Sequence, residues 1–352
     1  SILMNFYGNI ALVLSHVSLE FRLECCDKGI KLAKKYKNLT RLSALYHTKA
    51  IICSWMQDKK REFMYYKKSE RIKMIVGNEI EIVRVLNGTG YGYFYSGNYK
   101  KSIRYFSRAF KYLKETKDYT EIGALLYNVS ITYFFAREYE KSLKYFDFFV
   151  EMVRILELKS IPFHSLFGIY SLLGILCFKS GRPSKAVFCL FEIEKHRGNE
   201  KTEEMILYNY LRSLEYKAKG KNEKAAEAIE QIFDIIKNEA YFSFFIPMLS
   251  LDYSELLFEE GRIDDAKAAL TSGIETAQKI NYTEYAEILA KKLLKLEETG
   301  EKVSAEKIKL QDINIELNHI IDFAKLDTTL NKLHKKMTET NFLNNFQQVL
   351  LY

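Results

Sequence analysis

A glycine recurs at nearly constant spacing through most of this 352-residue chain. Successive glycines stand about 40 residues apart, with one interval of two steps, and each separates two stretches of helical apolar spacing. They are Gly97, Gly181, Gly220, Gly261 and Gly300. In the unit between the first two, Arg137 takes the glycine's place. A period of this length predicts an array of helical hairpins, because each unit buries its apolar face only against its neighbours.

Small residues recur in register with these turns. One stands seven residues before each turn residue and another stands five residues after it. The first set is Gly90, Ser130, Gly174, Ser213 and Ser254, and the second is Ser102, Ser142, Ala186, Ala225 and Ala266. Small side chains let the two helices of a hairpin approach closely. The glycine between them is expected to adopt the left-handed conformation that ends the first helix.

This pattern resembles the tetratricopeptide repeat, abbreviated TPR. The match is good around Gly97, Gly181, Gly220 and Gly261, and weaker nearer the start, where Gln57 stands at the glycine position. The standard repeat has about 34 residues. The longer units here resemble those of bacterial Rap-type and MalT-type peptide or ligand receptors and of the sensory halves of signalling proteins. The resemblance covers roughly residues 5 to 300 and implies an all-α, right-handed TPR-like superhelix of about seven or eight hairpins.

The composition of the sequence changes after Gly300. We therefore expect a helical-repeat domain over residues 1–300 and one long helix over residues 301–352, which contain neither glycine nor proline. Apolar residues recur there in steps of three to five, from Ile308 through Leu317 to Met337. Two interpretations stay open for this helix. It either caps the repeat array or forms a dimerising coiled coil that leads to an output domain.

Composition and motifs limit the function. The formal charge of +8 is a mild excess that does not require nucleic acid. The basic segment Lys59–Met74, with Tyr65 and Tyr66, is interpreted as a solvated helix face with its aromatic rings packed inward. The five cysteines form no C-x-x-C pair and are expected to be reduced and buried in a cytoplasmic protein. No membrane span, metal-ligand spacing, cofactor motif or catalytic signature is present, so we expect neither an enzyme nor a cofactor.

The TPR resemblance implies where a ligand would bind. In such repeats the first helix of each unit lines a concave groove, and counting along these helices selects mostly aromatic residues. The predicted peptide-binding residues are Asn87, Tyr91, Phe94, Tyr127, Asn128, Phe134, Tyr210 and Lys217. An asparagine side chain can bond both the N–H and the C=O of a peptide backbone, and aromatic walls supply apolar contact area. The alternative is that these aromatic residues close the groove by packing on each other.

The sequence thus predicts a protein- or peptide-binding TPR module that belongs to the sensory or regulatory part of a bacterial signalling protein. The alternative is the regulatory half of an enzyme, such as a diguanylate cyclase or a histidine kinase, whose catalytic domain is not in this chain. The expected partner is a peptide or protein segment in the groove, with a possible homodimer through the C-terminal helix. Nucleic acid is less favoured as a partner than a peptide or protein segment. The identity of the ligand stays open.

Overall fold

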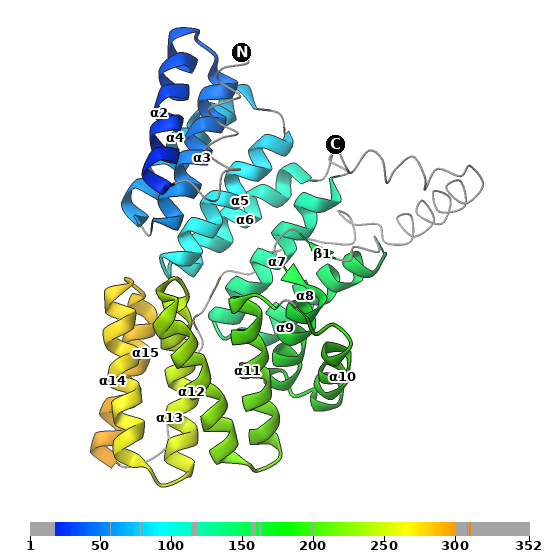
Figure 1. Cartoon of the computed structure of the whole chain (residues 1–352), viewed down its shortest axis with the longest axis vertical. Coiled ribbons are helices and arrows are strands. Elements are labelled where there is room, and N and C mark those ends of the chain that lie inside the picture. Colours follow the sequence, from blue (N-terminus) through cyan, green and yellow to red (C-terminus); the bar gives the residue numbers. More distant parts are fainter. Residues whose placement is uncertain are drawn as a thin grey trace, which may run out of the picture.

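The computed structural model describes residues 18–56, 58–77, 79–113, 118–155, 160–161, 164–198, 200–299, 308 and 310. Within them, α-helices follow one another with one 3-10 helix and one short hairpin between them (Figure 1). The helices are α2 (Leu19–Lys35), α3 (Leu39–Trp55), α4 (Lys59–Val76), α5 (Glu79–Tyr95), α6 (Tyr99–Leu113), α7 (Tyr119–Phe135), α8 (Tyr139–Ile155), α9 (Leu166–Lys179), α10 (Pro183–Glu194), α11 (Thr202–Ala218), α12 (Asn222–Asn238), α13 (Ile246–Glu259), α14 (Ile263–Lys279) and α15 (Thr283–Thr299).

Most of these helices pair as the repeat predicts. The hairpins are α3–α4, α5–α6, α7–α8, α9–α10, α11–α12 and α13–α14, each made of two consecutive helices in extensive contact. Helix α2 is the second helix of the degenerate first unit, and α15 begins a further unit whose turn at Gly300 lies outside the described residues. The chain is therefore an all-α, TPR-like superhelix, as the sequence predicted.

The turns between paired helices confirm the role of the recurring glycine. Gly97, Gly181, Gly220 and Gly261 have φ angles of +71°, +69°, +68° and +75°, the left-handed region that a side chain disfavours. Arg137 adopts the same conformation with φ +62°, although it carries a side chain. The turn thus has the same backbone conformation even where another residue stands in place of the glycine.

Close approach of paired helices is confirmed as well. A Cβ atom placed on Gly90 in α5 would lie 2.5 Å from the ring of Phe106 in α6, which is too near for any larger residue. On the next hairpin, the hydroxyl of Ser130 donates to the backbone carbonyl of Ser142 at 2.9 Å. The small residues therefore mark the places where the two helices of a hairpin touch.

The superhelix closes on itself, because its last repeats contact its middle repeats. The Tyr285 hydroxyl of α15 donates to the backbone carbonyl of Phe135 at the end of α7, at 2.5 Å. Lys100 in α6 forms an ion pair with Glu284 at 3.3 Å. In Figure 1 the yellow and orange helices α13–α15 accordingly lie below the cyan pair α5–α6. The axis of the superhelix is enclosed by segments far apart in the sequence.

Two connections between repeats depart from a plain turn. The strands β1 (Ser160–Ile161) and β2 (His164–Ser165) form a two-residue antiparallel hairpin between α8 and α9. The 3-10 helix η1 (Ala240–Phe245) joins α12 to α13. Pro247 in the first turn of α13 suits the helix start, where its missing N–H needs no partner. Neither connection was predicted.

Little of the predicted helix over residues 301–352 is described. Ile308 and Leu310 are buried, and the Ile308 N–H donates to the carbonyl of Ala136 at 3.0 Å in the turn between α7 and α8. The remaining residues of this segment lie outside the described part of the chain, so the cap and the dimerising coiled coil both stay predictions. All five cysteines are buried free thiols, as expected. Among the described residues no helix is long and apolar enough to cross a bilayer.

Candidate functional site

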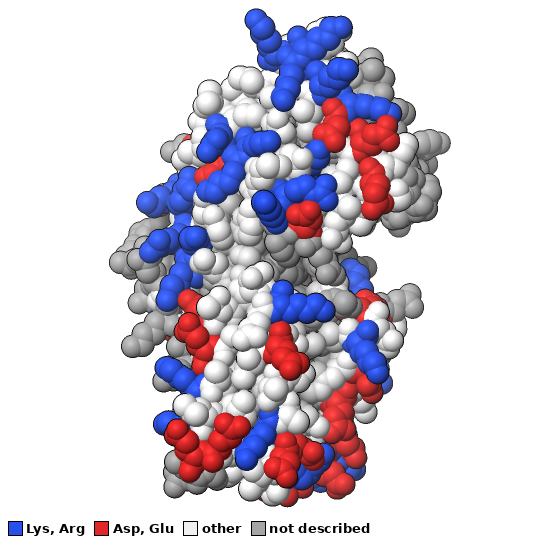
Figure 2. All heavy atoms as spheres, turned by 90° about the vertical axis from the view of Figure 1, so that its left-hand side faces the viewer, with Lys and Arg blue, Asp and Glu red and all other residues white. Residues whose placement is uncertain are grey.

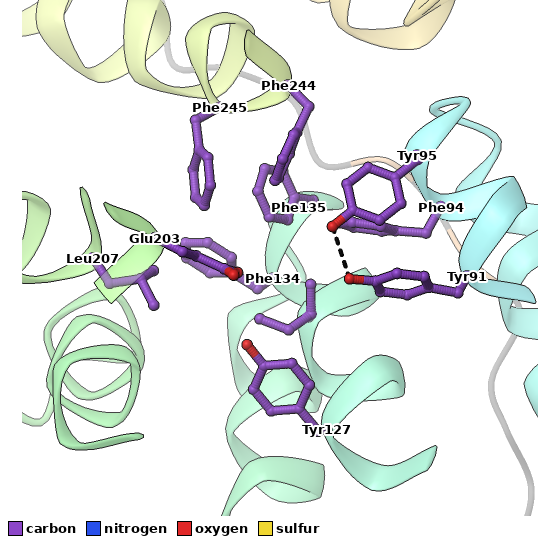
Figure 3. A pocket seen from close by; sticks show the side chains of 11 residues that line it. Tyr91, Phe94, Tyr95, Tyr127, Phe134, Phe135, Glu203, Leu207, Phe244 and Phe245 are labelled. Carbon is purple, nitrogen blue, oxygen red and sulfur yellow. Dashed lines mark hydrogen bonds between the residues drawn. The ribbon is translucent and has the colours of Figure 1, made fainter. Parts of the chain in front are cut away.

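A small cavity lies on the axis of the superhelix, where α5, α7, α11 and η1 converge (Figure 3). Its free volume is about 10 Å³, the space of about one water molecule. Aromatic and aliphatic side chains make up nearly all of its lining, with one carboxylate among them. The lining residues are Tyr91, Phe94, Tyr95, Tyr127, Ile131, Phe134, Phe135, Glu203, Leu207, Phe244 and Phe245.

Two helices supply one side of the cavity through simple helical spacing. In α5, Tyr91 and Tyr95 stand four residues apart and therefore on one face of the helix. Their hydroxyls share a hydrogen bond of 2.7 Å, drawn as a dashed line in Figure 3. In α7, Tyr127, Ile131 and Phe134 follow the same rule and point to the axis. Both helices are first helices of their repeats, which is where the TPR resemblance placed the groove.

The connection η1 closes the opposite side. Phe244 and Phe245 point from η1 toward the rings of α5 and α7 (Figure 3). The Phe244 ring lies 5.1 Å from that of Tyr95 in an edge-to-face arrangement, and the Phe245 ring lies 5.2 Å from that of Phe135. Such geometry is favourable for aromatic pairs beyond the area they bury. These contacts hold the last repeats against the middle ones.

Glu203 is the one ionisable carboxylate that lines the cavity. It lies in the first turn of α11, and its side chain extends among the rings of the cavity in Figure 3. Burial raises the pKa of Glu203 to about 7; nearby Glu204 adds to the rise and Lys201 opposes it. Within the described part of the chain, no hydrogen bond or ion pair to the Glu203 carboxylate is found. A half-buried carboxylate without an ion pair or a hydrogen bond distinguishes this cavity from ordinary core.

Four of the predicted binding residues come together here. Tyr91, Phe94, Tyr127 and Phe134 all line the cavity, with Phe94 and Phe134 fully buried and the two tyrosines partly exposed. The aromatic rings do pack on one another, as the alternative interpretation held, but they leave the small cavity between them. Their role in binding stays a prediction.

The two predicted asparagines contact each other. Asn128 of α7 donates from Nδ2 to Oδ1 of Asn87 in α5 at 2.9 Å, which ties neighbouring repeats together. Both residues are partly exposed. A peptide backbone could reach their remaining donors and acceptors, since each amide can make more than one hydrogen bond.

The last two predicted residues lie elsewhere. Tyr210 is buried and donates to the carboxylate of Asp252, which also pairs with Lys179 at 2.7 Å and Arg137 at 3.6 Å. Burial alone would raise the pKa of Asp252, but these two cations and its hydrogen bonds hold it below the usual range. This cluster fastens α13 to the middle repeats and does not line the cavity.

Lys217 is also separate from the cavity. Its ammonium group lies 3.5 Å from a carboxylate oxygen of Glu259 and 3.9 Å from one of Glu255, both in α13. Lys217 therefore belongs to a network of charges between α11 and α13. Its role in a binding groove stays a prediction, and this geometry does not favour it.

The predicted set leaves out seven lining residues: Tyr95, Ile131, Phe135, Glu203, Leu207, Phe244 and Phe245. Carboxylates on helices are usually solvated partners of neighbouring lysines, and nothing in the sequence around Glu203 distinguishes it from them. Phe244 and Phe245 belong to a connection, which the repeat pattern does not address. The aromatic run AYFSFF was the available signal, because so many aromatic residues in a connection need apolar surface to cover them.

Charged surfaces offer a second candidate region. Lys and Arg predominate on the upper half of the face in Figure 2, whereas its lower half carries both signs. Helix α6 bears five cations and no acidic residue. In the basic segment of α4, Tyr66 is buried, and Lys67 lies over the ring of Tyr105 in α6, 4.8 Å from its centroid. Tyr66 is thus packed inward as predicted.

No group of metal-binding side chains is present among the described residues.

Known proteins resemble this chain in structure. No family model matches it, and no curated protein matches it in sequence. The apo form of RapI superposes with a TM-score of 0.62 at 14% identity, over 79% of this chain and 98% of that one. A Rap protein complexed with Competence and Sporulation Factor superposes with a TM-score of 0.49 at 16% identity, over 84% and 97% of the two chains. The likeness to RapI shows that the chain has the fold of a Rap-type helical-repeat protein.

Proposed function

We propose that this chain is a peptide- or protein-binding module, acting as the sensory or regulatory part of a cytoplasmic bacterial signalling protein. The observation that carries the proposal is the aromatic cavity on the superhelix axis with the Glu203 carboxylate in its wall. Ligand sites in proteins are mostly apolar cavities with a few placed polar groups, and this cavity has that character. The proposal assigns no catalytic step to the chain.

The size of the cavity sets how a ligand would bind. Space for about one water molecule admits a single small group. The rest of a peptide would lie along the partly exposed residues at the edge, namely Tyr91, Tyr127 and the Asn87–Asn128 pair. The side-chain amides of the two asparagines would form hydrogen bonds with the peptide backbone, and the two tyrosine rings would cover the peptide's side chains. The fold shared with RapI supports a regulatory protein of this architecture.

A peptide-library selection tests the proposal. The full chain is incubated with randomised heptapeptides, and bound peptides are identified by mass spectrometry. Wild type and the groove variant Asn128→Ala are compared with Asn238→Ala, which removes an exposed amide at the end of α12 that bonds only its own helix. We expect related peptides to be enriched by wild type and the control and lost with Asn128→Ala. If no peptides are enriched, or if Asn128→Ala enriches the same peptides as wild type, binding in this groove is refuted.

A further inference from the structure

The surroundings of Glu203 are those of a site for a cation. In Figure 3 its carboxylate lies beside the ring of Phe134, and the hydroxyls of Tyr91, Tyr95 and Tyr127 point into the same space. The described residues provide no cation in contact with it. The face of an aromatic ring is electron-rich and attracts positive charge, most strongly where water is excluded. A carboxylate among rings therefore favours a ligand group that carries a positive charge.

Other ligand groups fit the cavity less well. An anionic group would be repelled by the carboxylate and by the ring faces. A neutral apolar group would bury the carboxylate without a partner, which costs free energy unless the carboxylate takes up a proton. A cation satisfies both the rings and the carboxylate at once.

Size distinguishes between kinds of cation. The free volume of about 10 Å³ corresponds to a group of about the size of water. A primary ammonium is a compact charge with three donors, whereas a guanidinium is a larger planar fork with five. The cavity therefore suits an ammonium group without rearrangement of its walls. The partial exposure of Tyr91, Tyr127 and Glu203 gives such a group a route from solvent.

We propose that this cavity binds a primary ammonium group of the ligand, with the Glu203 carboxylate as its counter-ion and the rings of Tyr91, Tyr95 and Tyr127 as its walls. This inference rests on the proposed peptide-binding function and specifies its chemistry. A peptide can present such a group in two ways, as its N-terminal amine or as a lysine side chain.

The pH dependence of binding follows from the groups that face Glu203. On its own helix they are Glu204 and, at the helix start, Lys201. The facing tyrosines are Tyr91 and Tyr95 of α5, Tyr127 of α7 and Tyr241 of η1, and burial raises the pKa of each above its usual value, so all stay neutral below pH 10. With the pKa of Glu203 near 7, about one tenth of this carboxyl is ionised at pH 6 and about nine tenths at pH 8. A bound cation favours the ionised form, so the affinity should rise about tenfold between these pH values.

Three short peptides test the inference on the full chain. The probes are pentaalanine amide with a free N-terminus, the same peptide N-acetylated, and N-acetyl-Ala-Ala-Lys-Ala-Ala amide. Dissociation constants are measured by NMR titration for wild type, Glu203→Gln and the control Glu223→Gln. Glu223 is an exposed carboxylate at the same position in the first turn of α12. Circular dichroism verifies that each variant is folded.

We expect at least one ammonium-bearing probe to bind wild type and Glu223→Gln alike and to bind Glu203→Gln at least tenfold more weakly. The acetylated pentaalanine should bind all three proteins weakly and equally. The pH profile identifies the source of the ammonium. A lysine side chain, with a pKa near 10.4, should give an affinity that rises through pH 7 and then stays constant. An N-terminal amine, with a pKa near 8, should give a maximum between pH 7 and 8.

Three results would overturn the inference. They are equal binding of the acetylated pentaalanine and both ammonium-bearing probes, binding of those probes that is unaffected by Glu203→Gln, and no binding of either ammonium-bearing probe. Each of these is distinct from failure of the proposed function. If the library selection still enriches peptides that depend on Asn128, the groove binds peptides but the cavity does not select an ammonium group. If the selection also fails, the peptide-binding function itself is refuted.

Discussion

Replacing Glu203 by glutamine should make the unliganded protein more stable at pH 8 than the wild type. The pKa of Glu203 is raised from 4.5 to about 7 in the folded state because burial disfavours the charged form. Ionised Glu203 is therefore tolerated better in the unfolded chain, where water surrounds it. Glutamine has nearly the same shape and carries no charge at any pH, so it removes this penalty.

The sign and size follow from linkage. A group whose pKa is raised on folding contributes its full stability below the unfolded value of 4.5, and this contribution is lost as the pH rises to about 7. A shift of about 2.5 units corresponds to about 3 kcal/mol, most of it between pH 5 and 8. Because Glu203 is only half-buried and water reaches its edge, we expect about 2 kcal/mol. The wild type should lose this amount over that pH range, and Glu203→Gln should not.

The assay is urea unfolding of the full chain followed by circular dichroism at pH 5 and pH 8. Glu223→Gln is again the control, because both glutamates lie in the first turn of a helix. There a negative charge stabilises the helix by about 0.3–1 kcal/mol, and both variants lose that contribution. Only Glu203→Gln should also gain stability at pH 8. If it loses as much stability as the wild type between pH 5 and 8, the carboxylate is not desolvated and the cavity site is wrong.

Three further substitutions test the packing. Ala225→Leu should lower the free energy of unfolding by about 1–3 kcal/mol, because Ala225 is fully buried between paired helices; a urea midpoint equal to that of wild type would contradict the repeat register. Gly90→Ala should lower the melting temperature despite a gain of about 1 kcal/mol in helix propensity, because the new Cβ would lie 2.5 Å from a ring of α6. Asp252→Asn should cost about 3 kcal/mol in urea unfolding, because Arg137 and Lys179 would lose their buried counter-charge, and an unchanged midpoint would contradict the closing role of this cluster.

The sequence predicted the features of this fold that repeat. Glycine at the turns and small residues at fixed distances from them are local requirements of each hairpin. They therefore recur from unit to unit and can be found without a structure. Arg137 shows how strong that register is, since it was placed at a turn by spacing alone and has the left-handed φ of +62°. The same counting found Tyr91, Phe94, Tyr127 and Phe134, because first helices of adjacent repeats face a common axis.

Closure of the superhelix could not be predicted in this way. It depends on the small rotation between successive repeats, and that rotation is set by packing between units whose spacing the sequence does not reveal. Phe244 and Phe245 meet residues of α5 and α7 only because the accumulated rotation returns η1 to them. Tyr210 lies in a first helix as counted, but its hydroxyl donates to Asp252 in the first helix of the next repeat, so it is already engaged. Residues at equivalent repeat positions therefore have different surroundings.

Closure also has a consequence for how the cavity responds to a ligand. Its walls come from α5, α7, α11 and η1, so no single repeat contains the site. A ligand that binds only the assembled cavity must stabilise the closed arrangement by the same free energy with which closure favours its binding. The unpaired carboxylate of Glu203 works against closure while the cavity is empty, because closure desolvates it. An ammonium group would remove that penalty, so a small ligand could strengthen the contact between the last repeats and the middle repeats.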